Sequence, residues 1–311
     1  MTESLAQAIH HTKDEKWRLT SNGGPRGYIQ PHALEELWFH TGTICNLSCS
    51  FCLEGSKPGD NRLEQITLED ARPIMREALD LGAQQFSFTG GEPFVNKAFP
   101  DILAHALDHR PCLVLTNGTA PLRKRLEAIR ALSGKPNKVR FRISLDSPDP
   151  AVHDAERGQG AFAVSLESMR LLHEAGFAVS VARLAGRDED KEAVDAQYRA
   201  HFAAAGVPED APIIVFPDFL PPGSTAHVPE ITENCMTQYH TAESRAQFMC
   251  AFSKMIVKKD GRMRVMACTL VDDDPSYDLG GSLTESMRYR IMLGHHRCFS
   301  CFSCGASCSE R

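Results

Sequence analysis

The sequence predicts an α/β fold in which a parallel sheet precedes a small, cysteine-rich module. Apolar strand-like runs alternate with amphipathic helical stretches from about residue 37 to residue 219, and prolines at 217, 221 and 222 end that pattern. Six strand–helix units in series imply parallel strands joined by right-handed crossovers. Such units form either an open, three-quarter barrel or a doubly wound sheet, and periodicity alone leaves both open. In either case a ligand site is expected at the carboxyl ends of the strands.

The expected strands and helices follow from local patterns. Runs rich in β-branched and aromatic residues predict strands at 37–43, 85–89, 113–116, 139–145, 178–184 and 213–216. Helical spacing predicts helices at 99–108, 122–132, 165–175 and 192–205. Another helix is expected to begin after Thr67, a suitable N-cap, and to end at Gly82, with Pro73 shifting its start or bending it.

A different pattern follows residue 222. Strands are expected at 254–258 and 263–267, because these flank Asp260-Gly261, a strong β-hairpin signal. Ser282 and Glu285 form a capping box that predicts a helix to about Leu293, and the stretch 298–308 is expected to be a cysteine-rich loop. The expected domains are an N-terminal extension at 1–34, the strand–helix part at 35–225 and the C-terminal module at 226–311.

Composition and charge argue against several classes of protein. Hydrophobic residues make up 42% and charged residues 24%, as in ordinary globular proteins. The net charge of −6 argues against a broad nucleic-acid surface, which needs clustered Lys and Arg. The sequence has no apolar run of about 18 residues and no secretory signal, so we expect no membrane contact and a cytoplasmic location. There, the 11 cysteines indicate metal or catalytic roles rather than disulfides.

Three cysteines follow the first expected strand directly, as Cys45-x3-Cys49-x2-Cys52. Three thiolates on one loop can each bind a different iron of a cubane cluster, whereas a complete four-iron cluster normally takes four thiolates. Such a loop leaves one iron open, and an open coordination position is where metal chemistry occurs. A zinc site is the alternative, although zinc sites more often show paired Cys-x2-Cys knuckles and four ligands.

The segment from Cys45 to Cys52 resembles the CxxxCxΦC loop of radical S-adenosylmethionine (SAM) enzymes, with Phe51 at the aromatic position. Similar motifs follow at the ends of the expected strands, in the family's order: Gly90-Gly91-Glu92-Pro93, Thr116-Asn117-Gly118 and Ser144-Leu145-Asp146. The next stretch resembles sulfatase-maturase-like members through His153-Asp154, Arg157-Gly158, Gly160 and Phe162. The resemblance covers about residues 37–220 and implies a partial (β/α)6 TIM-type barrel.

The resemblance also implies cofactors and their contacts. By this resemblance, the three loop cysteines hold a [4Fe-4S] cluster. The residues implied to bind SAM are Phe51, Gly90, Gly91, Glu92, Asn117, Ser144 and Arg157. Glycines let the backbone approach a ligand, and a carboxylate accepts hydrogen bonds from an ammonium group. Residues 90–92 are expected to hold the methionyl amino group, Asn117 and Ser144 the ribose or carboxylate, and Arg157 the carboxylate. Alone, each motif is an ordinary turn or cap, but their shared position at strand ends favours one site.

Seven cysteines lie from Cys235 onward. Cys250 and Cys268 flank the expected hairpin, whose turn should bring them together, and the later Cys298 and Cys301 complete an order that resembles the Twitch domain, which holds one auxiliary four-iron cluster. The longer SPASM domain holds two clusters, and the spacing here departs from its pattern. Cys304 and Cys308 extend a ferredoxin-like spacing, so either could replace a ligand. Structural zinc is the alternative.

The remaining candidates carry less information. Cys112 is expected to be a small core residue, the role of Cys235 is open, and His295-His296 is expected to line or cover the auxiliary cluster.

These features lead to three hypotheses. The first is a radical SAM oxidoreductase that cleaves SAM to a 5′-deoxyadenosyl radical and removes a hydrogen atom from a small-molecule or peptide substrate. By resemblance, it takes electrons from a flavodoxin- or ferredoxin-type reductant, and its auxiliary cluster assists electron transfer or anchors the substrate. The second is a non-catalytic iron–sulfur electron carrier, which would need no SAM pocket. The third is a zinc-stabilised binding protein.

Overall fold

The computed structural model describes residues 15–186, 188–216, 227–305 and 309. The chain divides into two compact units, each assembled from separate stretches of the sequence. Unit 1 comprises Met1–Trp38, Pro73–Gln84 and Gly223–Arg311, and unit 2 comprises Phe39–Arg72 and Gln85–Pro222. The domain bounds expected from the sequence stay a prediction.

A parallel sheet forms the centre of unit 2. Five strands pair in sequence order: β3 (Gln85–Thr89), β4 (Cys112–Thr116), β5 (Val139–Ser144), β6 (Ala178–Leu184) and β7 (Ile213–Phe216). Strand β2 (Glu36–His40) precedes them, and just beyond it the amide of Thr41 donates to the carbonyl of Thr89 at 2.8 Å. The predicted α/β fold with a mostly parallel sheet is confirmed, and all six strands begin and end within a few residues of their predicted bounds.

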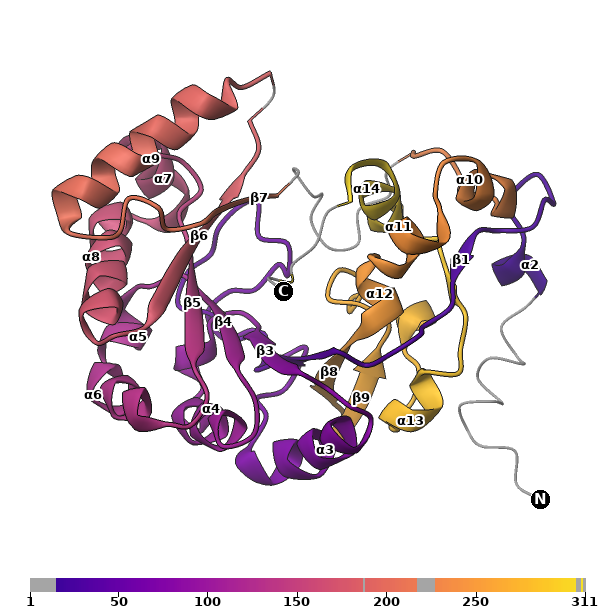
Figure 1. Cartoon of the computed structure of the whole chain (residues 1–311), viewed down its shortest axis with the longest axis horizontal. Coiled ribbons are helices and arrows are strands. Elements are labelled where there is room, and N and C mark those ends of the chain that lie inside the picture. The colour runs from indigo at the N-terminus through magenta and orange to yellow at the C-terminus, as the bar shows by residue number, and fades with distance from the viewer. Residues whose placement is uncertain (1–14, 187, 217–226, 306–308, 310–311) are drawn as a thin grey trace. The chain divides into compact units, whose positions relative to one another are not determined.

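Helices connect these strands, and Figure 1 shows α4, α5, α6 and α8 along the outer side of the sheet. The helices are α3 (Leu68–Asp80), α4 (Phe99–Leu107), α5 (Ala120–Arg123), α6 (Leu126–Arg130), α7 (Pro150–Arg157), α8 (Ala161–Glu174) and α9 (Lys191–Ala205). Short 3-10 helices occur at η1 (Pro93–Val95) and η2 (Ala131–Gly134). The single helix predicted at 122–132 is wrong, because α5, α6 and η2 divide that stretch, and each buries one leucine or isoleucine.

Helix α3 begins where the sequence predicted. Thr67 forms a reciprocal cap with Asp70: its Oγ1 accepts from the amide of Asp70 at 3.2 Å, and its own amide donates to Asp70 Oδ2 at 2.8 Å. The start is therefore not shifted by Pro73, and the helix continues past that residue to Asp80. Gly82, at a φ of +95°, then takes the left-handed conformation that ends the helix.

Alternation along the strands gives the sheet of unit 2 two different faces. Phe88 of β3 lies edge-on to Phe99 of α4, with ring centroids 5.3 Å apart, and Phe39 of β2 stacks on Phe88 at 5.6 Å. These rings join the sheet to its helices. On the opposite face, Arg142 pairs in register with Ser180, and both are fully buried. Ser144 lies on this polar face too, two residues beyond Arg142 and at the end of β5.

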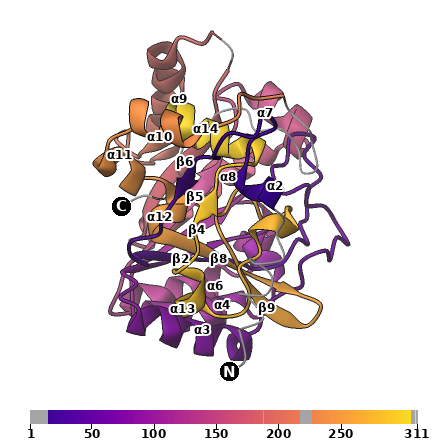
Figure 2. The ribbon, with the colours of Figure 1, turned by 90° about the vertical axis from the view of Figure 1, so that its right-hand side faces the viewer.

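Unit 1 contains the predicted hairpin, which Figure 2 shows as β8 and β9. Strands β8 (Ser253–Lys259) and β9 (Arg262–Met266) are antiparallel, and Asp260 and Gly261 turn the chain with φ values of +51° and +69°. A second pair joins β1 (Tyr28–Ile29) to β10 (Ile291–Met292). The helical segments of this unit are α2 (Glu15–Arg18), α10 (Glu233–Gln238), α11 (Ala242–Ala246), α12 (Met249–Phe252), η3 (Pro275–Tyr277), α13 (Leu283–Ser286) and α14 (His296–Cys304).

Two predictions for the C-terminal module are wrong. The capping residue Ser282 accepts from the amide of Glu285 at 3.3 Å, yet the helix ends at Ser286 and does not reach Leu293. The chain instead becomes extended, because Ile291 and Met292 pair with β1. The expected loop at 298–308 is helical up to Cys304, because His295 caps α14 and Gly305 ends it in the left-handed conformation.

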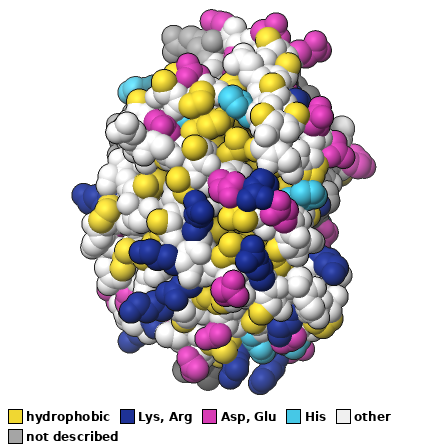
Figure 3. Space-filling model, turned by 90° about the vertical axis from the view of Figure 1, so that its left-hand side faces the viewer, with side chains coloured by type: hydrophobic (Ala, Val, Ile, Leu, Met, Phe, Trp, Pro, Cys, Tyr) yellow, Lys and Arg dark blue, Asp and Glu magenta, His cyan; other side chains and the backbone are white. Residues whose placement is uncertain are grey.

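Two further features concern the helices and the surface of the molecule. Among the described residues, no helix combines the length and apolar character that crossing a membrane requires. On the face drawn in Figure 3, acidic and basic side chains are interspersed with polar and apolar ones.

Candidate functional site

The three cysteines of the first cluster lie on a loop between β2 and α3, and we call residues 45–52 the cysteine loop. The amide of Cys45 donates to the carbonyl of Lys57 at 3.3 Å, which closes the base of the loop. Within it, the amide of Cys52 donates to the carbonyl of Cys49 at 3.2 Å. Cys45 is buried, whereas Cys49 and Cys52 are partly exposed. The loop therefore presents three thiols from a closed backbone frame.

Burial affects the charge of these thiols. It raises the pKa of Cys45 to about 11 and also raises the pKa values of Cys49 and Cys52. Neutral thiols are thus favoured at neutral pH, whereas metal binding requires thiolates and drives their deprotonation. Three neighbouring thiols of this kind suit a bound metal group better than a free nucleophile.

The glycine pair at the end of β3 packs directly against the stem of the cysteine loop. The amide of Gly91 donates to the carbonyl of Gly42 at 2.9 Å, and that of Glu92 donates to the carbonyl of Ile44 at 3.2 Å. A Cβ atom on Gly91 would lie 2.5 Å from the carbonyl oxygen of Ile44, and one on Gly90 would lie 2.8 Å from that of Gly42. Only glycine permits this approach, so the two backbones form one support.

Glu92 is buried and organises the next strand end. Its Oε1 accepts from Thr116 Oγ1 at 2.8 Å and from the amide of Phe94 at 3.2 Å, while Oε2 accepts from the amide of Asn117 at 2.8 Å. A carboxylate offers about four acceptor positions, so one stays available for a ligand ammonium. Burial raises the pKa of Glu92 to about 7, against these three hydrogen bonds, which favour its ionised form.

Asn117 belongs to a side-chain network that connects the third strand end to the cysteine loop. Its Oδ1 accepts from Thr119 Oγ1 at 2.6 Å, and its Nδ2 donates to Asn46 Oδ1 at 3.1 Å and points toward Cys45 Sγ at 3.9 Å. Asn46 Nδ2 in turn donates to Thr119 Oγ1 at 3.0 Å. Sequence reasoning missed Asn46 and Thr119, although their places beside Cys45 and Asn117 are a usable signal.

The ends of β5 and α7 contribute an ion pair beside the cysteine loop. Arg157 donates through Nε and Nη2 to both carboxylate oxygens of Asp146, and its guanidinium lies over the Phe51 ring, 5.5 Å from the centroid. Ser50 Oγ also donates to Glu156 at 2.5 Å. Arg157 thus has a partner before any ligand binds, and Ser144 lies two residues before Asp146.

The motif between α7 and α8 shapes the turn that carries Arg157. Asp154 accepts from the amides of Gly160 and Phe162, at 2.6 and 2.8 Å, and so caps the start of α8. His153 packs edge-on against Phe162, with centroids 5.6 Å apart. These residues hold the backbone, and none of these contacts involves the cysteine loop.

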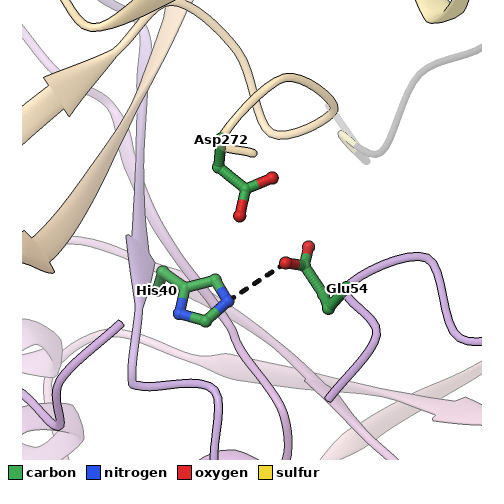
Figure 4. A group of neighbouring side chains, drawn as sticks. All are labelled: His40, Glu54 and Asp272. Carbon is green, nitrogen blue, oxygen red and sulfur yellow. Dashed lines mark hydrogen bonds and ion pairs between the residues drawn. The ribbon is translucent and has the colours of Figure 1, made fainter. Parts of the chain in front are cut away.

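His40, at the end of β2, was missed by sequence reasoning. Its Nδ1 accepts from the amide of Gly42 at 3.2 Å, which leaves Nε2 to donate to Glu54 Oε2 at 3.3 Å, and Figure 4 shows this contact. The His40 side chain is fully buried. It links the end of the strand to the segment that follows Cys52.

A second set of thiols lines a cavity in unit 1. Four cysteines face it, one each from α12 and the segment after β9 and two from α14: Cys250, Cys268, Cys298 and Cys301. Apolar side chains, including Phe248, Leu270 and Val271, form much of the remaining wall. Burial raises the pKa of Cys268 to about 11 and also raises those of Cys250 and Cys298.

The spacing of these sulfur atoms bears on the metal. Tetrahedral zinc with Zn–S bonds of about 2.3 Å holds its sulfurs about 3.8 Å apart. Among the residues that the structure describes, no three thiol sulfurs lie within 4.8 Å of one another. The described thiols are therefore not preassembled at the spacing of a zinc site with three or more thiolate ligands.

The other candidates take varied positions. Cys112 is buried in β4 and Cys235 is partly exposed on α10. The ring of His295 caps α14 through Nδ1, which accepts from the amide of Arg297 at 3.2 Å. The Cys304 side chain and the whole of Cys308 lie outside what the structure describes, so their proposed ligand roles stay predictions.

Residues 39–198 match the sequence profile of a known family, the Radical SAM superfamily. This span covers more than half of the 311 residues. It contains the cysteine loop, the glycine pair and the other strand-end candidates described above.

Two curated proteins resemble part of the chain. The antilisterial bacteriocin subtilosin biosynthesis protein AlbA of Bacillus subtilis (strain 168) is 32% identical over 166 residues, which cover 53% of this chain and 35% of AlbA. The AdoMet-dependent heme synthase of Nitratidesulfovibrio vulgaris is 31% identical over 150 residues, 46% of this chain and 38% of the synthase. The matches thus span little more than a third of each relative.

Solved structures show the same fold at low sequence identity. SuiB of Streptococcus suis bound to S-adenosylmethionine gives a TM-score of 0.56 at 14% identity, over 80% of this chain and 63% of SuiB. SuiB bound to the precursor peptide SuiA gives a TM-score of 0.59 at 13% identity, over 91% and 68% of the two chains.

Proposed function

The chain belongs to the radical SAM superfamily, and on this premise we propose that it cleaves SAM reductively to a 5′-deoxyadenosyl radical that removes a hydrogen atom from a substrate. Membership confirms that the chain resembles this family. The narrower resemblance to sulfatase-maturase-like members and to Twitch or SPASM domains stays a prediction. One observation carries the proposal: the stem of a three-thiol loop is hydrogen-bonded to the backbone of Gly91 and Glu92, at the carboxyl end of β3.

The donor set of the cysteine loop fits a [4Fe-4S] cluster. Cys45, Cys49 and Cys52 would hold three irons and leave the fourth for SAM. When bound, the cluster and SAM supply the one-electron cleavage of the sulfonium bond. The chain's own part is to fix the loop, through Gly91, and to orient the cosubstrate against it.

The strand-end residues are proposed to bind SAM. Glu92 and the backbone of Gly90 and Gly91 would receive the methionyl ammonium, because Glu92 keeps one acceptor position. Asn117 and Ser144 would contact the ribose or carboxylate. Phe51 belongs to the same proposed site. Because Arg157 already pairs with Asp146, it would bind the carboxylate of SAM only by sharing its guanidinium.

We also propose an auxiliary [4Fe-4S] cluster in the cavity of unit 1, held by Cys250, Cys268, Cys298 and Cys301. Four thiolates complete a cluster, and the apolar wall excludes water. This cluster would assist electron transfer or anchor the substrate. Cys304 and Cys308 are the alternative ligands.

The substrate is proposed to be a peptide or a small molecule. AlbA takes part in bacteriocin biosynthesis and SuiB is bound to a precursor peptide, whereas the heme synthase acts in heme synthesis. A flavodoxin- or ferredoxin-type protein would supply the electron. The oxidoreductase class of the reaction is part of the same proposal.

Anaerobic turnover tests the proposal. The reconstituted protein, reduced with dithionite in the presence of SAM, should release 5′-deoxyadenosine and methionine in equal amounts. Cys49→Ala should abolish this release, whereas Cys112→Ala, the matched change of a buried core cysteine, should retain it.

The rival hypotheses predict different results. An electron carrier would contain iron and sulfide but release no 5′-deoxyadenosine. A zinc-stabilised binding protein would purify anaerobically as a colourless protein with stoichiometric zinc. Either result would overturn the proposed function.

A further inference from the structure

A lysine is buried against the backbone of Cys250, one of the cysteines that line the unit 1 cavity. Lys254, the second residue of β8, has no exposed surface. Its Nζ donates to the carbonyl oxygens of Cys250 and Ser253, at 2.9 Å each. An ammonium group has three donors, so two carbonyls nearly satisfy its hydrogen bonding but do not neutralise its charge.

The ionisable groups that interact with this ammonium group are thiols. Burial of an ammonium group is unfavourable unless a negative group lies near. Lys254 contacts the backbone of Cys250 directly, its charge also interacts with Cys268, and within the described residues no carboxylate pairs with it. Arg297, another buried cation at this cavity, differs, because Asp273 lies 3.5 Å from its Nη1.

Thiolates at Cys250 and Cys268 would supply the negative charge that the buried ammonium of Lys254 needs. Cysteines that bind iron are thiolates, and a cluster with four thiolates carries negative charge that increases when it accepts an electron. A fixed positive charge beside two of its ligands therefore stabilises the reduced form more than the oxidised form. Buried surroundings screen this interaction little.

We propose that Lys254 sets the reduction potential of the auxiliary cluster, raising it through the charge held beside Cys250 and Cys268. This rests on the auxiliary cluster of the proposed function. Tuning of a potential matters for a cluster that exchanges electrons, so the arrangement favours electron transfer over substrate anchoring as the task of this centre. Lys254 acts through the ligands and touches no substrate.

The test is a redox titration of the auxiliary cluster alone. The full chain carrying Cys45→Ala, Cys49→Ala and Cys52→Ala is reconstituted anaerobically, and its midpoint potential is followed by EPR at neutral pH. Lys254→Met should make reduction at least tenfold less favourable, a midpoint lowered by about 59 mV for one electron. Lys254→Arg, which keeps the charge, should stay much closer to the parent.

Controls separate charge at this site from other effects. Lys259→Met removes an exposed charge from the same strand and should leave the midpoint unchanged. If Lys254→Met does not fold, Lys254→Gln, neutral but able to donate to the carbonyls, takes its place with the same expected shift.

The outcomes are distinct. A parent variant that binds no iron overturns the auxiliary cluster and this inference with it. A parent with a full cluster whose midpoint does not change in Lys254→Met or Lys254→Gln overturns the inference alone. An equal shift in Lys254→Arg and Lys254→Met also overturns it, because loss of charge would then not be the cause.

Discussion

Arg157 and Asp146 form a two-point ion pair at the edge of the cysteine loop, and both side chains are largely buried. Asp146 follows β5 and Arg157 ends α7, so the pair fixes this helix to the sheet. The guanidinium also covers the ring of Phe51, which lies between Cys49 and Cys52 in the sequence. Loop, helix and strand are therefore held by one side chain.

Replacing Arg157 by Met should lower the free energy of unfolding by about 3 kcal/mol, because it leaves the Asp146 carboxylate buried without its partner. In an Asp146→Ala background the same change should cost only about 1 kcal/mol, for the lost cation–π contact with Phe51. Urea unfolding of the four proteins in a double-mutant cycle measures the difference. Equal costs in both backgrounds would show that the ion pair contributes nothing.

Gly91→Ala should displace the cysteine loop, because the new methyl group would meet the carbonyl oxygens of Thr43 and Ile44 at 2.6 and 2.5 Å. The clash is with backbone, so it cannot be relieved by a side-chain rotation. We expect iron in the first cluster to fall severalfold and 5′-deoxyadenosine formation to fall at least as much. Gly134→Ala is the matched control, because its Cβ would meet no atom within 4 Å. Equal iron content in both variants would contradict the proposed role of Gly91.

The buried carboxyl of Glu92 should make stability depend on pH. Its folded pKa of about 7 lies above its ordinary value of 4.5, so the folded state keeps the proton to a higher pH than the unfolded state does. The stabilisation that comes from this raised pKa is fully present below the unfolded pKa. It is lost as pH rises toward 7, and the total loss in the free energy of unfolding is on the order of 3 kcal/mol. Glu92→Gln does not titrate, so its stability should not show this pH-dependent loss. The difference in the free energy of unfolding between the parent and this variant should therefore become smaller from pH 5 to pH 7.5. Urea unfolding across that range measures it, and a constant deficit would contradict the shifted pKa.

Removal of single cysteines should distinguish ligands from core residues in unit 1. With the first cluster deleted by the triple alanine change, we expect about four irons per chain. Cys250→Ala and Cys298→Ala should each remove most of them, whereas Cys235→Ala should leave the count unchanged. Iron and sulfide quantitation gives the answer, and the same experiment on Cys304→Ala tests the alternative ligand. If Cys250→Ala kept its iron, Cys250 would not be a ligand and the cluster would have to be assigned to other cysteines.

Much of the fold could be predicted because it depends on local patterns. The strands at 85–89, 178–184 and 213–216 have the predicted bounds, since short β-branched and aromatic runs between turns leave few alternatives. Thr67 likewise marks the start of α3, because its cap involves only residues three positions apart.

The errors come from contacts between distant residues. The helix after Ser282 ends early because Ile291 pairs with Ile29, more than 200 positions away, and no local pattern contains that pairing. In the candidate site, the motif residues could be identified from spacing and resemblance. The positions of Asn46 and Thr119 beside motif residues were a signal, but their hydrogen bonds to each other and to Asn117 could not be predicted, because these depend on where two loops meet.

Helix α14 spans His296–Cys304 and carries two of the proposed ligands, Cys298 and Cys301, one turn apart on the same side. A helix this short has little stability by itself. Iron binding and the helix would therefore stabilise each other. Bonds from iron to the two thiolates would stabilise the helical turn, and the turn would hold both sulfurs on one side for the metal. Chelation of the metal would then melt this segment first, and oxidative damage to either thiol would do the same.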